Sequence, residues 1–215
     1  MLLASETLIF SPMNEMPSKL KARAERKNAK RDVKKRQIAE SAILALQELG
    51  YANTSLRDIA EKSDMSLGML HYYFEDRSEL IIYCVSIYKQ QFVSNIVDAL
   101  AGAEGRDSVI ETFSNALAES ITDDAMTHRL WYDIRSQAMF DETFRPIVHE
   151  IEEMLVGIVA DALEKAGHPI DETLAIQYAL IDGVFLHLMQ RQISDGPQDT
   201  AEVAAVFRGI FEKLL

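Results

Sequence analysis

Apolar residues recur at intervals of three and four along most of the chain, the spacing that places them on one face of a helix. Glycine and proline are few, and no part of the sequence reads as a strand-rich domain. The segments that predict helices are 33–49, 56–62, 67–73, 77–101, 107–121, 124–139, 141–166, 172–192 and 198–213. We therefore expect an all-α fold, with a hinge near the break at 101–107.

The second and third predicted helices are short and separated by a tight turn. Ser55 and Ser66 precede them, and each hydroxyl can accept a hydrogen bond from a backbone N–H of the first turn. Asp58 makes a capping box with Ser55, with Asp in place of the usual Glu. Asp64 lies in the turn, where aspartate tolerates a left-handed backbone. With helix 33–49, this is the layout of a helix-turn-helix domain, whose second short helix reads the major groove of DNA.

Segment 54–81, TSLRDIAEKSDMSLGMLHYYFEDRSELI, resembles the DNA-binding domain of the TetR family of bacterial transcriptional regulators. The resemblance extends over about residues 33–85. Asp64 replaces the family's usual turn glycine, and His71 stands where tyrosine is common. The acidic remainder resembles the family's second domain in layout alone.

This resemblance implies a fold and a function. The fold is an N-terminal three-helix DNA-binding domain followed by a C-terminal helical bundle for ligand binding and dimerisation. The function is sequence-specific regulation of transcription. We expect a repressor that a small-molecule ligand releases from its operator. The sequence does not exclude an activator.

The resemblance also implies DNA contacts for nine residues. Those that would face the groove are Ser66, Leu67, Gly68 and Met69. Of these, Leu67 and Met69 could meet thymine methyl groups by apolar contact, and Gly68 allows close approach. Those that would contact phosphates are Ser55, Arg57, His71, Tyr72 and Arg77; for Arg57 a base is the other target. A solvated surface position is the alternative for His71 and Arg57.

Charge is unevenly distributed along the chain. The net charge of −12 argues by itself against a nucleic-acid partner. Residues 1–36, however, hold ten bases, all between Lys19 and Arg36, against four acids. A basic arm resolves the conflict because local positive charge decides contact with phosphates, although a solvated leader fits equally. The expected divisions are the arm at 1–30, a DNA-binding domain at 31–78 and a ligand-binding and dimerisation domain at 79–215.

Two long helices predicted in the C-terminal half indicate packing on more than one side. Helix 141–166 carries a seam of apolar residues at Phe144, Val148, Ile151, Leu155, Ile158 and Ala162. Helix 172–192 is apolar nearly all round, and Gly183 permits close approach of another helix. We expect both to form a homodimer interface, although a core seam within one chain also explains the first. Two-fold symmetry would match a palindromic operator in double-stranded DNA.

The C-terminal half also holds candidates for an effector site. They are His128, Trp131, Tyr132, Arg135, Met139 and Phe185. Aromatic rings, methionine and a single charge suit an amphipathic small molecule. A cage for a quaternary ammonium group, from Trp131 and Tyr132 beside Asp133, is a weaker alternative. Ordinary bundle core and surface explain the same residues equally well.

Motifs of enzymes are missing from the sequence. It has no glycine-rich phosphate loop and no Gly-x-Ser-x-Gly elbow, and His149 with Glu153 lacks the second histidine of a zinc-protease helix. Cys84 is the single cysteine, so an intramolecular disulfide is excluded. We expect no catalytic activity, metal, cofactor or membrane span, and a cytoplasmic location. A helical adaptor protein without DNA binding is the alternative function.

Overall fold

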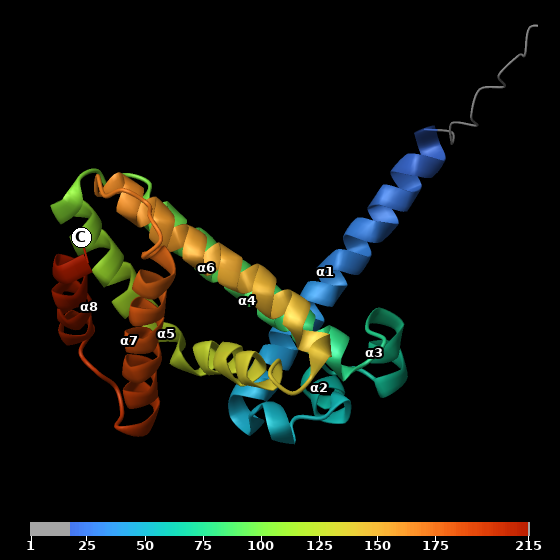
Figure 1. Ribbon diagram of the computed structural model, residues 1–215. Helices are drawn as coiled ribbons and strands as arrows, with labels where there is room; N and C mark the ends of the chain where they lie inside the picture. The colour runs from blue at the N-terminus through green and yellow to red at the C-terminus, as the bar shows by residue number, and fades with distance from the viewer. Residues whose placement is uncertain (1–17, 215) are drawn as a thin grey trace, which may run out of the picture. The chain divides into compact units, whose positions relative to one another are not determined.

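The computed structural model describes residues 18–214, and every regular element in this range is helical (Figure 1). The α-helices are α1 (Ser18–Leu49), α2 (Leu56–Lys62), α3 (Leu67–Tyr73), α4 (Arg77–Leu100), α5 (Arg106–Gln137), α6 (Arg145–Lys165), α7 (Leu174–Ser194) and α8 (Thr200–Leu214). The short 3-10 helices η1 (Tyr51–Asn53) and η2 (Glu142–Phe144) precede α2 and α6. The predicted all-α fold is confirmed. The chain divides into two compact units, Met1–Arg36 and Gln37–Leu215.

The two short helices have the local structure that the sequence predicts. At the start of α2, the Ser55 hydroxyl accepts a hydrogen bond from the Asp58 N–H, and the Asp58 carboxylate accepts one from the Ser55 N–H (2.7 Å). At the start of α3, the Ser66 hydroxyl accepts from the Met69 N–H at 3.2 Å. Asp64 in the turn has a φ of 51°, in the left-handed region. Both predicted caps and the turn are therefore confirmed.

Two helices differ in extent from the prediction. α1 begins at Ser18, well before residue 33, so the basic segment is helical, which is one of the two forms that the sequence allowed. α5 is one element where two were expected. Its backbone leaves helical geometry at Asp124 (φ −126°, ψ 21°). The break predicted at 122–124 is thus a kink, because no glycine or proline ends the helix there.

Buried apolar side chains of residues 37–215 form two clusters. The smaller cluster surrounds the short helices and includes Ile38, Ala42, Ile59, Leu70, Phe74, Leu80 and Cys84. The larger cluster lies among the helices from α4 to α8 and includes Phe92, Ile96, Trp131, Phe185 and Phe207. α4 contributes to both, with Leu80 and Cys84 near its start and Phe92 and Ile96 farther along. One continuous helix therefore joins the two cores.

The larger cluster is a helical bundle. α5 lies against α4, α7 and α8, and α4 runs beside α6 (Figure 1). The apolar seam predicted for 141–166 fills the core of its own chain, since Phe144 of η2 and Ile151 of α6 are completely buried. α7 buries Phe185 on one side, whereas Ile176 and Leu180 are 62% and 51% exposed. Part of the apolar surface of α7 is therefore uncovered in a single chain.

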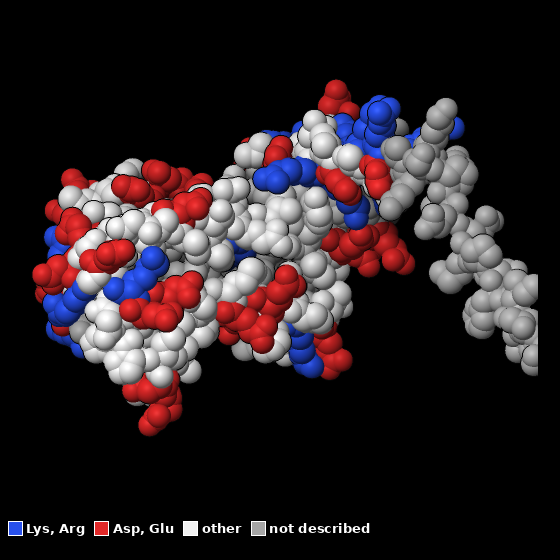
Figure 2. Space-filling model, turned by 90° about the horizontal axis from the view of Figure 1, so that it is seen from above, with Lys and Arg blue, Asp and Glu red and all other residues white. Residues whose placement is uncertain are grey.

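The outer surface of the bundle is acidic. Asp and Glu side chains are spread over its helices on the face drawn in Figure 2, with fewer basic side chains between them. Among the described helices, none has the length and apolar character needed to cross a membrane.

Candidate functional site

The first turns of α3 are exposed. Ser66, Leu67, Gly68, Met69, His71 and Tyr72 all face solvent. Three of these side chains are apolar or aromatic: Leu67 is 37% exposed, Met69 51% and Tyr72 60%. Large apolar side chains that gather on the exposed side of one short helix are available to a partner.

The buried side of α3 fixes this exposed surface in place. Leu70 and Phe74 lie in the smaller cluster, and neither is more than 1% exposed. The half-buried ring of Tyr73 meets the ring of Tyr72 edge-on, with centroids 5.0 Å apart, and so orients Tyr72. A Cβ at Gly68 would meet no atom within 4 Å, so the surface there is open to close approach.

The structure gives Arg77 contacts inside the fold that the sequence did not predict. Its guanidinium donates hydrogen bonds to the backbone carbonyls of Thr54 (2.8 Å) and Tyr51, and it lies 4.3 Å from the centre of the Tyr51 ring. These contacts bind the start of α4 to the loop before α2. Arg77 therefore has a structural role through two of its five N–H donors, and its contact with a phosphate stays a prediction.

Arg57 and Ser55, at the start of α2, differ in their availability. Arg57 is exposed. The Ser55 hydroxyl lies 2.5 Å from the Asp58 carboxylate and donates to it, and these bonds to Ser55 lower the pKa of Asp58. The hydroxyl proton of Ser55 is thus committed to the capping box, so a phosphate contact would have to displace Asp58. Arg57 remains the candidate for a contact from α2.

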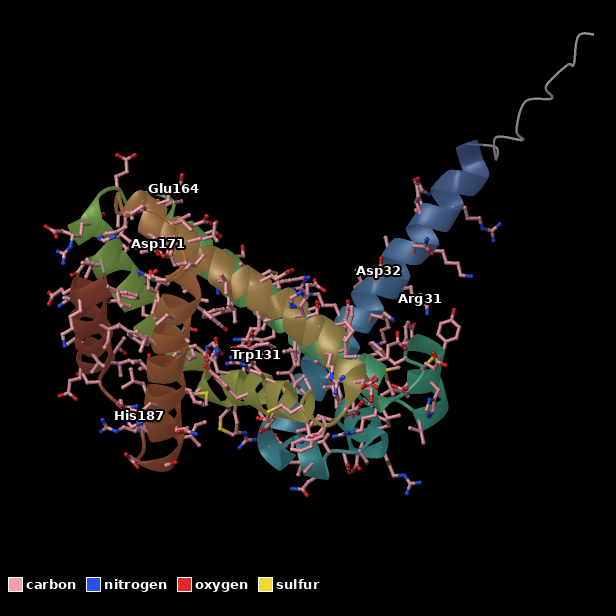
Figure 3. The ribbon with its side chains drawn as sticks, in the orientation of Figure 1. Arg31, Asp32, Trp131, Glu164, Asp171 and His187 are labelled. Atoms are coloured by element: carbon pink, nitrogen blue, oxygen red, sulfur yellow. The ribbon has the colours of Figure 1, made fainter. Side chains whose placement is uncertain are left out.

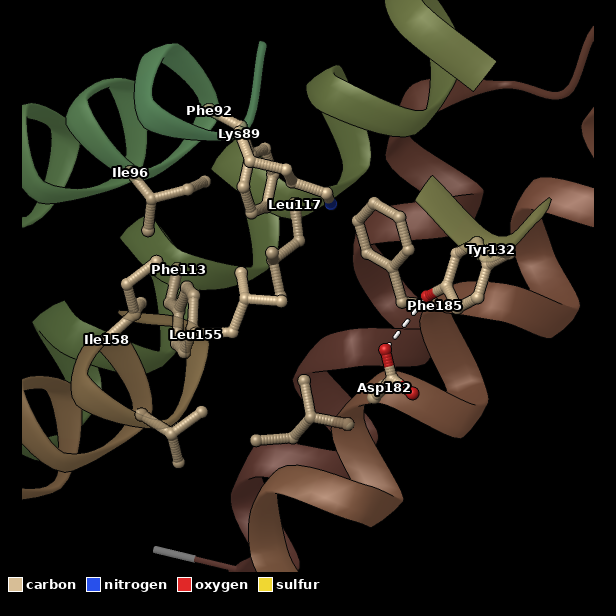
Figure 4. Close-up of a pocket in the computed structure, with 12 residues that line it drawn as sticks. Lys89, Phe92, Ile96, Phe113, Leu117, Tyr132, Leu155, Ile158, Asp182 and Phe185 are labelled. Atoms are coloured by element: carbon tan, nitrogen blue, oxygen red, sulfur yellow. Dashed lines mark hydrogen bonds between the residues drawn. The ribbon is translucent and has the colours of Figure 1, made fainter. Parts of the chain in front are cut away.

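A cavity lies between α4, α5, α6 and α7 (Figure 4). Most of its lining is aromatic or aliphatic and consists of Phe92, Ile96, Phe113, Leu117, Leu155, Ile158, Val159, Ile181 and Phe185. Three polar side chains complete the lining: Lys89, Tyr132 and Asp182. An apolar wall with a few convergent polar groups is typical of a small-molecule site.

Asp182 is the centre of a polar network at the edge of this cavity. Its carboxylate accepts hydrogen bonds from the Tyr132 hydroxyl at 2.9 Å and from Arg135 at 2.5 Å. Arg135 also forms an ion pair of 2.6 Å with Glu152 on α6. Burial and the charge of Asp182 raise the pKa of Tyr132, so its hydroxyl keeps the proton that it donates. The network joins α5 to both α6 and α7.

Of the six predicted effector-site residues, Tyr132 and Phe185 line the cavity directly. Arg135 reaches the cavity only through Asp182. His128 lies behind the wall, with its ring centroid 4.7 Å from that of Phe185.

Trp131 and Met139 do not line this cavity. Trp131 on α5 (Figure 3) is completely buried, and among the described residues its indole N–H has no hydrogen-bond partner. Met139 is 69% exposed and lines a separate surface hollow with Arg135. The cage of Trp131 and Tyr132 for a quaternary ammonium group is not formed, because only Tyr132 reaches the cavity. Trp131 and Met139 therefore lie outside the lining of this cavity.

Lys89 is the functional candidate that the sequence analysis missed. It is only 2% exposed and lines the cavity from α4. The sequence held a signal for it, because Lys89 occupies a position of the apolar stripe that runs through Val85, Phe92 and Ile96 at helical spacing. A lysine within such a stripe points into the core.

A metal centre finds no support in the part of the chain that the structure describes. No group of three or more His, Cys, Asp or Glu side chains there could hold a metal ion. His149 and Glu153 lie 3.2 Å apart on an exposed face of α6, an ordinary surface pair.

The chain matches two family models. That of the bacterial regulatory proteins of the tetR family covers residues 38–84, and that of the tetracyclin repressor-like C-terminal domain covers residues 104–213. The HTH-type transcriptional regulator PksA of Bacillus subtilis (strain 168) is 26% identical over 165 residues, 73% of this chain and 78% of PksA.

Solved structures share the fold. A regulatory protein in the tetR family from Rhodococcus RHA1 has a TM-score of 0.67 and 19% identity, over 84% of this chain and 95% of that chain. The multidrug binding protein EbrR, complexed with proflavin, has a TM-score of 0.58 and 21% identity, over 82% and 98% of the two chains. The helix-turn-helix match and the match to the second domain agree with the two cores described above. The chain belongs to the TetR family and is a DNA-binding regulator of transcription.

Proposed function

We propose that this regulator is a homodimeric repressor that binds a palindromic operator and leaves it when a small molecule enters the cavity. It acts in the cytoplasm, where bacterial DNA lies, and has no catalytic step. The residues proposed to contact DNA are Arg57, Ser66, Leu67, Gly68, Met69, His71 and Tyr72. Their exposure on and beside α3 supports this set.

The observation that carries the proposal is the position of α4. Leu80 and Cys84 of this helix pack in the core of the DNA-binding segment, while Lys89, Phe92 and Ile96 line the cavity. A ligand that binds one position of α4 more tightly than another changes the position of the helix pair. We retain 31–78 and 79–215 as the functional domains, with α4 shared between them.

The second half of α5 offers another connection between the cavity and the DNA-binding segment. The Thr127 hydroxyl accepts a 2.5 Å hydrogen bond from Gln47 of α1, and Arg129 donates to the Gln47 carbonyl at 3.1 Å. Tyr132, which lines the cavity, follows on the same half of α5, beyond the kink at Asp124. The complex of EbrR with proflavin, in a protein of the same fold, supports a small molecule as the effector.

The uncovered face of α7 supports the dimer. Ile176, Leu180 and Gly183 are exposed and follow one another at helical spacing, so they share one face. Two copies of this face, related by a two-fold axis, would bury both apolar strips. We assign α7 the larger part of the dimer interface and α6 the smaller, because the apolar seam of α6 is used within its own chain.

The basic part of α1 adds to the affinity for DNA. Arg23, Arg26, Lys27, Lys30 and Arg31 are all exposed on a helix. We assign these side chains to phosphate contacts that do not depend on base sequence. This segment lies outside the regions that the two family models match, so the proposal for these side chains rests on their charge and exposure alone.

Selection from a random duplex pool tests the proposed function. The full chain should enrich a palindrome whose half-sites lie about 10 base pairs apart centre to centre. Met69→Ala should weaken selection, whereas Met139→Ala, which removes an exposed methionine far from α3 in sequence, should not. No enriched sequence, and no binding to any duplex at low salt, would favour the adaptor alternative.

A further inference from the structure

Lys89 is a buried amine in the lining of the cavity, and the negative charge of Asp182, another lining residue, favours its charged form without forming an ion pair with it. Its ammonium group lies 4.7 Å from the ring centre of Phe92, 5.3 Å from that of Trp131 and 5.4 Å from that of Tyr88. In the described part of the chain it forms no ion pair with a carboxylate. Aromatic faces compensate a buried cation only partly, so Lys89 is ready to accept an anion.

The charged and titratable groups around Lys89 are already engaged. The Asp182 carboxylate holds Tyr132 on one oxygen and Arg135 on the other. His128 contacts the Tyr88 hydroxyl through Nδ1 and the Ser120 hydroxyl through Nε2, and burial with the nearby Lys89 lowers its pKa well below the usual value. His128 is therefore neutral, and Lys89 is a lining cation whose ammonium group forms no ion pair among the described residues.

We propose that the cavity binds an amphipathic monoanion, a molecule with an apolar body and one carboxylate that pairs with the Lys89 ammonium. The body would lie against Phe113, Leu117, Leu155 and Ile158, which belong to the apolar part of the lining (Figure 4). A single lysine balances a single negative charge, which favours a carboxylate over a phosphate dianion. An amphipathic cation would meet Lys89 directly and is disfavoured.

Proton linkage agrees with this assignment. Burial lowers the pKa of Lys89 to about 7 in the free protein. A bound carboxylate favours the charged amine and raises that pKa again. Binding at pH 8 therefore takes up a proton, which calorimetry in two buffers of different ionisation enthalpy measures directly.

Three probes with the same apolar chain test the head group: octanoate, octan-1-ol and octyltrimethylammonium. Each is titrated calorimetrically into the full chain without DNA. We expect octanoate to bind at least about tenfold more tightly than either other probe, as a charge-assisted contact in a dry site does. Equal binding of octanoate and octanol, a preference for the cation, or no octanoate binding at all would overturn the inference.

Two variants assign the effect to Lys89. Lys89→Met should remove the preference for octanoate and leave octanol binding unchanged or stronger, while Lys89→Arg should keep part of the preference. A preference for octanoate that survives in Lys89→Met would overturn the inference. If Lys89→Met does not fold, the proton uptake that accompanies octanoate binding to the unmodified chain tests the role of Lys89 instead. Uptake near zero at pH 8 would overturn the inference.

This inference rests on the proposal that the cavity is the effector site. Different experimental results would refute the ligand class and the release mechanism. Octanoate that binds through Lys89 without changing operator affinity upholds the ligand class and refutes the release mechanism. Operator release by octanol and octanoate alike upholds the release mechanism and refutes the role of the carboxylate.

Discussion

The hydroxyl of Tyr132 donates a 2.9 Å hydrogen bond to the carboxylate of Asp182, which ties α5 to α7 at the edge of the cavity. The other oxygen of Asp182 accepts from Arg135 at 2.5 Å. With its two oxygens held by these donors, Asp182 acts on the Lys89 ammonium only from farther away, and Lys89 forms no ion pair among the described residues. The contact therefore shapes both the stability of the bundle and the charge of the cavity.

Tyr132→Phe should destabilise the bundle, because the variant removes one donor from a partly buried carboxylate. We expect a loss of about 1–2 kcal/mol in the free energy of unfolding, measured by urea denaturation. Tyr72→Phe, at a 60% exposed ring, is the matched control and should change stability by less than about 0.5 kcal/mol. Equal effects of the two variants would show that the bond to Asp182 adds nothing.

Arg77→Ala should act on stability rather than on DNA recognition. The change leaves two backbone carbonyls, those of Thr54 and Tyr51, without their donor, and we expect a loss of about 2–3 kcal/mol. Arg57→Ala, at an exposed side chain, should keep the unfolding midpoint and weaken operator binding. The phosphate role expected from the sequence would be restored if Arg77→Ala kept full stability and lost only DNA affinity.

Lys89→Met should stabilise the protein in a way that depends on pH. Because the pKa of Lys89 is lowered from 10.5 to about 7, the unfolded chain binds an extra proton between these values, and native stability rises with pH across that window. Below about pH 7 the folded chain carries the buried charge at full cost. The variant should therefore raise Tm at pH 6, by about 2–4 °C per kcal/mol gained, and by less at pH 10.

The control for this experiment is Lys30→Met, which removes an exposed lysine and should leave the pH profile of Tm unchanged. A profile of Lys89→Met that runs parallel to that of the unmodified chain from pH 6 to pH 10 would contradict the shifted titration.

Leu180→Glu should produce monomers. A carboxylate on the uncovered face of α7 would be buried without a partner in the proposed dimer, at a cost of several kcal/mol. Sedimentation velocity measures the outcome. Leu44→Glu replaces a leucine with the same exposed fraction, 51%, on α1, and should leave the dimer intact. A dimeric Leu180→Glu protein would move the interface away from α7.

Replacing Lys27, Lys30 and Arg31 together by Gln should weaken binding to random duplex. If each side chain neutralises one phosphate, the slope of log affinity against log salt should fall by roughly 2–3. Lys165→Gln with Lys213→Gln, on α6 and α8, is the control and should keep the slope. An unchanged slope in the triple variant would identify the basic segment as a solvated leader.

Local features of the site followed from the sequence, and long-range features did not. Ser55, Asp58 and Ser66 cap helices through partners three residues away, so their positions alone predict the bonds. The partners of Arg77 lie 23 and 26 residues earlier in the chain, and the residues near Arg77 do not predict them.

The effector site shows the same limit. Aromatic residues near one another on a helix, such as Trp131 and Tyr132, point in different directions, and only the packing of four helices decides which one reaches the cavity. Lys89 is the exception, since a lysine at an apolar position of a helical stripe is predicted from the sequence to point into the core. A search for charged residues at apolar positions would have found it.

The sharing of α4 between two cores has a consequence for how the molecule opens. A fluctuation that separates either core exposes apolar side chains on this one helix, from Leu80 to Ile96. The two cores should therefore lose their protection against hydrogen exchange together, as one cooperative unit. A ligand that binds only in the cavity would then slow amide exchange in α2 and α3, which it never touches.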